Sequence, residues 1–407
     1  MTQKKMGRPP TTFLLRAALL ILLVDASVFG LSEYGNLMHA GMISGGLRIL
    51  AMGLIATQYV LDARVNRSTF WGMALSCAVF LISFLRSHTS HMLYMTAAIL
   101  IANRVGFERL IRFEVKIRTV ILVFILSSSL LGLIPNYMPY RIGTEIERHS
   151  LGFTHPNTLG MQLFVAAAEW IYVLKEKQMI KRMTVALFFA IAIEGLSKSR
   201  TSLVCLAFYA GCLLIMEKRR KQRVWKSVLW LIRHAQTLAC LFCIGAFMVI
   251  TQSEWAMRMD ALLSGRLNNA YRVYTQYGFT WMGQNVRLVA TRMAKETGER
   301  MAILDIAPLR MMIQCGIVPM VLMLWAYQKA LTKAAAEKDK PMLALLLTFC
   351  MFGMAESTFN NPMVNLCWFY AFRTCFRPED RKRRREQRVY FIFESRKRIN
   401  QEKREDK

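Results

Sequence analysis

Long apolar stretches separated by short polar or basic segments run along this chain from residue 13 to residue 375. A helix needs about twenty apolar residues to cross the hydrocarbon of a bilayer, and somewhat fewer where flanking side chains reach the interface. By this rule the pattern predicts twelve transmembrane helices, of which the fourth, seventh and eleventh are short. The predicted spans are 13–31, 41–61, 69–86, 91–103, 117–135, 158–174, 183–197, 201–216, 235–251, 307–328, 341–355 and 361–375.

Basic residues predict how these helices are oriented, because Lys and Arg concentrate on the cytoplasmic side of membrane proteins. Most of the 54 Lys and Arg fall in segments that share one side when the N-terminus is cytoplasmic. We therefore expect a bacterial plasma-membrane protein with both termini in the cytoplasm, a transmembrane bundle over residues 1–376 and a basic cytoplasmic tail over 377–407. The net charge of +28 then needs no nucleic-acid partner, because its basic blocks alternate with apolar segments.

Two of the loops left on the outer side are long, covering residues 136–157 and 252–306. Loops of that length between packed helices usually carry function. Several arginines also fall on this side, and the planar fork of arginine suits phosphate and pyrophosphate groups. The expected fold class is thus an all-α polytopic membrane bundle with a large external loop.

Charged side chains inside predicted spans are a second feature, because such groups are costly in lipid unless they are paired or face water. Asp25 and Arg48 lie at similar depths in adjacent spans, so we expect an ion pair between them. Glu169 and Glu194 either line a cavity or serve a structural role.

Four short motifs on the outer side recur in a fixed order. They are RHSLGFTHPNTLG at 148–160, SRT at 199–201, SGR at 264–266, and LD at 304–305 followed by CGIV at 315–318. In order and sidedness they resemble the Wzy-type polysaccharide polymerases and the related O-antigen ligases. After the LD pair this chain has Ile-Ala-Pro at 306–308, where the family often places Asn or His followed by Tyr. The ligase-type histidine is therefore absent, which favours the polymerase.

The resemblance implies an integral-membrane glycosyltransferase that needs no metal or other cofactor. It would join oligosaccharide repeat units carried on undecaprenyl diphosphate into a capsule, exopolysaccharide or O-antigen-like polymer on the outer face of the membrane. Its partners would be that lipid-linked oligosaccharide, membrane lipids, and flippase and chain-length regulator proteins. The residues expected to bind the diphosphate are Arg148, Arg200 and Arg266. The candidates for the base that accepts the proton of the acceptor hydroxyl are His155, Asp305, Glu194 and His149.

Other functions remain open from the sequence. An O-antigen-type ligase would differ only in its acceptor. A flippase or transporter for lipid-linked oligosaccharides is expected to have paired halves and broken helices, and the sequence shows no such internal repeat. A non-catalytic membrane scaffold would place no demand on the outer arginines.

Overall fold

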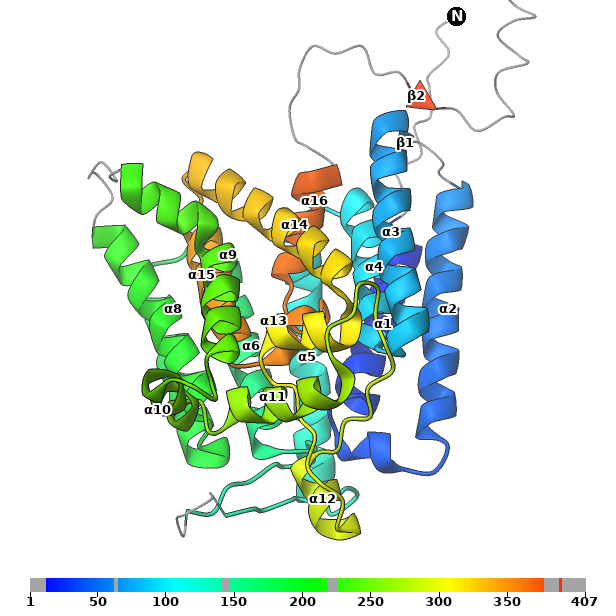
Figure 1. The fold of residues 1–407 in the computed structure, drawn as a ribbon. Coiled ribbons are helices and arrows are strands. Elements are labelled where there is room, and N and C mark those ends of the chain that lie inside the picture. The colour runs from blue at the N-terminus through cyan, green and yellow to red at the C-terminus, as the bar shows by residue number, and fades with distance from the viewer. Residues whose placement is uncertain (1–11, 62–64, 141–145, 219–225, 377–387, 390–407) are drawn as a thin grey trace, which may run out of the picture.

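The computed structural model in Figure 1 describes residues 12–61, 65–140, 146–218, 226–376 and 388–389. Within these residues the fold is all-helical apart from two short paired strands, which confirms the all-α part of the predicted class. The helices are α1 (Phe13–Val24), α2 (Ala40–Leu61), α3 (Arg67–Ser87), α4 (Ser90–Arg104), α5 (Phe107–Leu130), α6 (Pro156–Val173), α7 (Met179–Ala192), α8 (Arg200–Lys218), α9 (Lys226–Met248), α10 (Glu254–Leu262), α11 (Arg266–Tyr277), α12 (Thr291–Thr297), α13 (Ala307–Arg310), α14 (Ile317–Ala336), α15 (Lys340–Gly353) and α16 (Cys367–Phe376).

Short π-helical and 3-10 turns adjoin several of these helices, and two strands complete the fold. The turns are η1 (Asp25–Phe29), η2 (Glu33–Asn36), η3 (Ile193–Ser197), η4 (Met311–Cys315) and η5 (Ser357–Asn360). The strands β1 (Val65–Asn66) and β2 (Arg388–Val389) pair in antiparallel register. Apart from β2, the tail predicted for 377–407 lies outside the described residues.

Four helices are long and apolar enough to cross a membrane, namely α2, α3, α8 and the part of α9 from Ser227 onward. They indicate a membrane protein, but the predicted count of twelve spans is not supported by helix length and composition. Every predicted span overlaps a helix, yet α4 has 15 residues, α15 has 14 and α16 has 10. Helices this short do not span the hydrocarbon unaided.

The predicted span 307–328 is broken at Gly316, which the hydropathy pattern did not indicate. Gly316 has a φ of 117°, and a Cβ there would lie 2.6 Å from the carbonyl oxygen of Trp281. The chain turns here so that the N–H of Ile317 donates to the carbonyl of Thr280 at 2.9 Å. Only glycine adopts this conformation without strain, and the break lets the long loop pack against the base of α14.

The four long helices lie at the periphery of the bundle. At most 28% of the most apolar stretch of each is buried inside the protein. Large apolar side chains cover their exposed faces, for example Ile49, Leu75, Val204 and Leu241. In contrast, most residues of α4, α6 and α15 are buried. An apolar exterior around a packed centre is the arrangement expected of a bundle in lipid.

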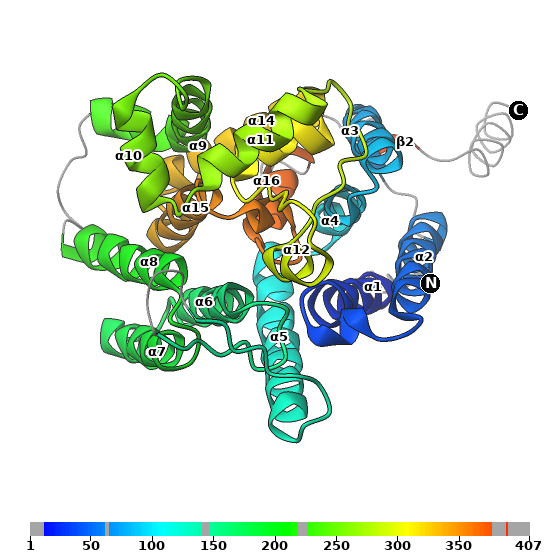
Figure 2. The same ribbon diagram turned by 60° about the horizontal axis from the view of Figure 1, so that its bottom comes forward.

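The connection between α5 and α6 lies at the same end of the bundle as α10, α11 and α12, and we call this the loop end. In Figure 1 it is at the bottom, whereas α1 begins and α16 finishes near the top. The loop end is tied together by Arg292 of α12, whose Nη1 donates to Glu33 at 2.8 Å while its guanidinium stacks over Tyr137. Figure 2 shows α12 in front of the middle of the bundle. Both loops predicted to be external thus meet at one end.

Two buried ionic networks connect helices in the bundle. The predicted pair is confirmed, because Arg48 Nε lies 2.7 Å from Asp25 Oδ2. The other network was not predicted and centres on Arg118, whose Nε contacts Glu169 at 3.1 Å and whose Nη2 donates to Glu114. Glu114 lies between the predicted spans 91–103 and 117–135, but α5 begins at Phe107 and carries Glu114 into the packed bundle.

Candidate functional site

Arg148 lies in the irregular segment that leads into α6 and is held by two hydrogen bonds. Its Nε donates to the carbonyl of Ser197 at 3.0 Å, and its Nη2 donates to Oδ1 of Asn157. The residue is 8% exposed. Because Ser197 lies two residues before the SRT motif at 199–201, this arginine connects the 148–160 motif to the turn that leads into the SRT motif.

Gly160 allows α6 to pack closely against the segment that contains Ser197 and Ser199. The first turn of α6 approaches η3 so closely that a Cβ at Gly160 would lie 2.4 Å from Cβ of Ser199 and 2.7 Å from Oγ of Ser197. No side chain fits at this position without moving the backbone. The glycine that closes the 148–160 motif therefore allows α6 and the start of α8 to pack together.

Replacing Gly160 with alanine is expected to destabilise the protein by about 1–3 kcal/mol, the usual cost of overpacking a close contact. The effect would be measured as a lower melting temperature of the purified protein in detergent. Gly211→Ala in α8 is the matched control, because nothing lies within 4 Å of a Cβ there. Alanine favours a helix over glycine by about 1 kcal/mol, so the control should melt at the same or a higher temperature. Equal melting temperatures for the two variants would contradict the close-packing role.

His155 caps the N-terminus of α6, with Pro156 at the first helical position. Its Nδ1 accepts a hydrogen bond from the backbone N–H of Asn157 at 3.1 Å, so the proton of the neutral ring resides on Nε2. Burial, and then the charges of Arg148 and Arg266, lower the pKa of His155 to about 4. At neutral pH the ring is therefore an uncharged donor, and Nε2 offers no lone pair to a substrate hydroxyl.

Arg266 is the first residue of α11 and reaches from the long loop to the bundle. Gly265 precedes it with a φ of 79°, and Asp260 caps the helix by accepting backbone N–H groups of its first turn. The Nη2 of Arg266 donates to Glu356 at 2.9 Å, and its Nε lies 3.6 Å from Asp305. Its Nη1 is buried and has no hydrogen-bond partner among the described residues. A buried guanidinium with an unused donor is well suited to bind an anionic group.

Asp305 and Glu356 are the two carboxylates of this region. Asp305 is the more accessible, because 35% of its side chain is exposed compared with 16% for Glu356. Burial raises the pKa of Asp305 above its ordinary value, and the charges of Arg266 and Arg310 oppose that rise. Burial likewise raises the pKa of Glu356, although Arg266 opposes it. Asp305 therefore combines access to solvent with a basicity greater than that of a carboxylate in water.

We call Arg148, His155, Arg266 and Glu356 the arginine cluster. Its members come from the connection before α6, from α11 and from the connection after α15. The charges of both arginines help to lower the pKa of His155, so the three side chains lie within electrostatic range of one another. The cluster offers two guanidinium groups and one neutral ring donor, and the carboxylate of Asp305 lies 3.6 Å from Nε of Arg266.

Three other residues expected at the site are either exposed or form hydrogen bonds with neighbouring segments instead. Glu194 in η3 and Arg200 at the start of α8 have exposed side chains, and neither forms an ion pair within the described part of the chain. His149 is half-buried, with Nδ1 3.3 Å from Nδ2 of Asn136 and its backbone N–H bonded to Leu196. The structure places none of the three in the arginine cluster.

Two residues of the region were missed by the sequence analysis. Glu356 lies just after a predicted span and has no motif around it, so only its contact with Arg266 reveals it. Arg310 lies inside the predicted span 307–328, where a charged residue is a functional candidate by default. Applying that rule to every span would have found Arg310.

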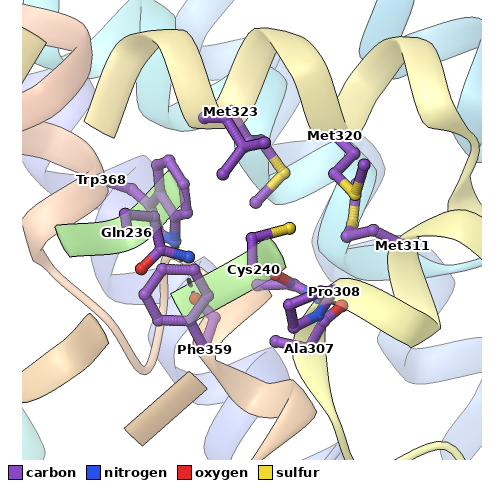
Figure 3. Close-up of a pocket in the computed structure, with 11 residues that line it drawn as sticks. Gln236, Cys240, Ala307, Pro308, Met311, Met320, Met323, Phe359 and Trp368 are labelled. Carbon is purple, nitrogen blue, oxygen red and sulfur yellow. Dashed lines mark hydrogen bonds between the residues drawn. The ribbon is translucent and has the colours of Figure 1, made fainter. Parts of the chain in front are cut away.

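A separate, mostly apolar pocket lies between α9, α13, η4, α14, η5 and α16. Figure 3 shows Met311, Met320 and Met323 on one side of it and Phe359 with Trp368 on the other. None of the residues that line it is charged, so it offers no site for a diphosphate. Among the described residues there is also no group of three or more His, Cys, Asp or Glu that could hold a metal ion.

No protein-family model, curated protein or solved structure matches this chain.

Proposed function

We propose that this protein is a membrane-embedded polymerase that joins lipid-diphosphate-linked oligosaccharide repeat units, with the loop end on the outer face of a bacterial plasma membrane. The observation that carries the proposal is the convergence of Arg148, Arg266 and His155 beside the accessible carboxylate of Asp305. In support, three of the motifs that resemble the Wzy-type polymerases supply these side chains, namely those at 148–160, 264–266 and 304–305. The basic segments predicted to be cytoplasmic support the orientation.

The chemistry requires a cationic pocket for the leaving group and a base for the acceptor. The acceptor hydroxyl oxygen bonds to the anomeric carbon of the donor while the bond between that carbon and the phosphate oxygen breaks. The electron pair leaves with the lipid diphosphate, whose developing charge Arg148 and Arg266 stabilise. The hydroxyl proton passes to Asp305. The Nε2–H of His155 donates to the same diphosphate, so the ring acts as a binding group.

Polymer formation by the purified full-length protein in detergent tests this function. The substrate is a lipid-linked oligosaccharide repeat unit, and products are resolved by gel as a ladder of chain lengths. A ladder formed without any membrane compartment supports the polymerase and excludes a flippase, which moves its substrate without joining it. No ladder, with transfer of a single glycan to a different acceptor instead, would favour a ligase and overturn the proposal.

The rate of polymerisation should depend on pH through Asp305, which acts as a base only when it is ionised. Because burial raises its pKa, the rate should fall with decreasing pH at a higher pH than for a carboxylate in water. Asp305→Asn should lower kcat by about 10²–10⁴-fold and remove this acid limb. Glu254→Gln, an exposed carboxylate in the same loop, is the matched control and should leave the profile unchanged. An unaltered acid limb in Asp305→Asn would assign the base to another group.

A further inference from the structure

The helix α10, at the start of the long loop, carries apolar side chains along one side. Trp255, Met259 and Leu262 follow one another at intervals of four and three residues, which places them on one face of a helix. Trp255 is 48% exposed, Leu262 is 79% exposed, and Met259 is half-buried. On the adjoining stripe, Arg258 Nη2 lies 3.3 Å from Glu254 Oε2 in an exposed ion pair. The helix is therefore amphipathic, and its apolar stripe faces outward.

The axis of α10 lies across the direction of the long helices. In Figure 1, α2 and α3 run up the page, whereas α10 is seen nearly end-on at the lower left. It follows α9, whose apolar stretch runs from Ser227 to the end of the helix at Met248, and residues 249–253 connect the two. The helix α10 therefore lies close to the level at which the apolar surface of α9 ends. For a helix that crosses a bilayer, this level is the interface between lipid and water.

The apolar stripe of α10 is continuous with the outward-facing surface of α9. The ring centroids of Trp255 and Phe242 are 6.0 Å apart. Phe242 and its neighbour Leu241 are both exposed, and only 17% of the apolar stretch of α9 is buried inside the protein. Met248 and Val249 extend this exposed apolar surface into the connection before α10. Because the two rings are adjacent, lipid that covers Phe242 also reaches Trp255.

We infer that α10 is an interfacial helix that binds the lipid surface at the loop end through Trp255, Met259 and Leu262. Tryptophan suits this depth because its ring has an apolar body and a polar N–H. Amphipathic helices of this kind lie in the plane of the interface, with the apolar face buried by about 5–10 Å at the boundary between head groups and acyl chains. The first part of the long loop is then held on the membrane instead of extending into water.

Lipid binding by α10 also sets the depth of Arg266, because Asp260 joins α10 to α11. Asp260 is buried on the side of α10 that faces the protein, and its Oδ1 accepts the backbone N–H of Leu267 at 2.7 Å and of Asn268 at 3.4 Å. Its carbonyl accepts the N–H of Gly265 at 2.8 Å. Anchoring α10 therefore holds Arg266 near the head groups, where the phosphates of a lipid-linked diphosphate lie. This role of Arg266 rests on the proposed function, whereas lipid binding by α10 does not.

The test is the quenching of Trp255 fluorescence in the full-length protein reconstituted into phosphatidylcholine vesicles. Bromine quenches tryptophan on contact, so lipids brominated near the carbonyl end or near the methyl end of an acyl chain report the depth of the ring. The signal of Trp255 is the difference between the wild type and Trp255→Phe, a variant that keeps an aromatic ring beside Phe242. Trp368→Phe gives the matched control signal, because Trp368 is buried inside the bundle.

Bromine near the carbonyl end should quench the Trp255 signal about twofold or more strongly than bromine near the methyl end, as expected for a ring at the interface. Neither lipid should quench the Trp368 signal. Stronger quenching by bromine near the methyl end would place α10 in the hydrocarbon and overturn the proposal. Quenching by neither lipid would also overturn it, since Trp255 would then face water or be covered by protein, such as a second copy of this chain. Quenching does not depend on turnover, so a failed polymerase assay would leave the lipid site standing.

Discussion

Arg266→Gln is expected to abolish polymer formation, with kcat reduced by about 10²–10³-fold or more, the usual cost of removing one preorganised donor to a developing negative charge. Arg266 contacts Glu356 and Asp305 and has one buried terminal nitrogen without a partner. Losing the guanidinium removes both the diphosphate contact and the charge that balances the carboxylates. The measurement is the rate of ladder formation in detergent.

A structural explanation can be separated from the catalytic one by restoring the charge balance. Arg266→Gln/Glu356→Gln removes the ion pair as a whole, so it should melt near the wild-type temperature while remaining inactive. Arg258→Gln is the matched control, because Arg258 belongs to the same loop and its side chain is 82% exposed. Wild-type activity in the double variant would show that the guanidinium is dispensable for catalysis.

Arg118→Met should produce the largest loss of stability, about 3–5 kcal/mol, as is typical when one partner of a buried ionic network is removed. Arg118 is 2% exposed and contacts Glu114, Glu169 and the amide of Gln162. Without it, two carboxyl groups remain in a packed interior with no cation. The loss would be measured as a fall in the melting temperature of the purified protein in detergent.

The triple variant Arg118→Met/Glu114→Gln/Glu169→Gln should recover most of this loss, because no buried charge then lacks a partner. Arg112→Met provides the matched control on the same helix, since Arg112 of α5 is exposed. If Arg118→Met and Arg112→Met melt at the same temperature, the network does not hold α5 and α6 together.

The arrangement of the candidate site was only partly predictable from motifs. Arg148, His155, Arg266 and Asp305 were all expected, and the structure brings them to one end of the bundle. The role expected for His155 as a base does not fit its position, because capping α6 occupies the nitrogen that lacks a proton. Which nitrogen a histidine offers depends on its neighbour in space, and no motif records that neighbour.

The distance of a residue from a motif also does not predict whether it forms an ion pair at the site. Glu356 pairs with Arg266 although the two are far apart in the sequence. Glu194 lies near the SRT motif and Arg200 lies within it, yet both side chains are exposed. A local pattern indicates which residue types occur together, whereas ion pairing depends on how helices pack.

By itself, the sequence determined that this protein is all-helical and where most helices of the bundle lie. Helix formation and apolar periodicity depend on neighbouring residues, so they can be read along the chain. The tertiary structure alone decided that four helices are long and apolar enough to cross a membrane, that the chain breaks at Gly316, and that Arg266 contacts both Asp305 and Glu356. These features arise from contacts between distant segments, because packing and burial set the distances between charges.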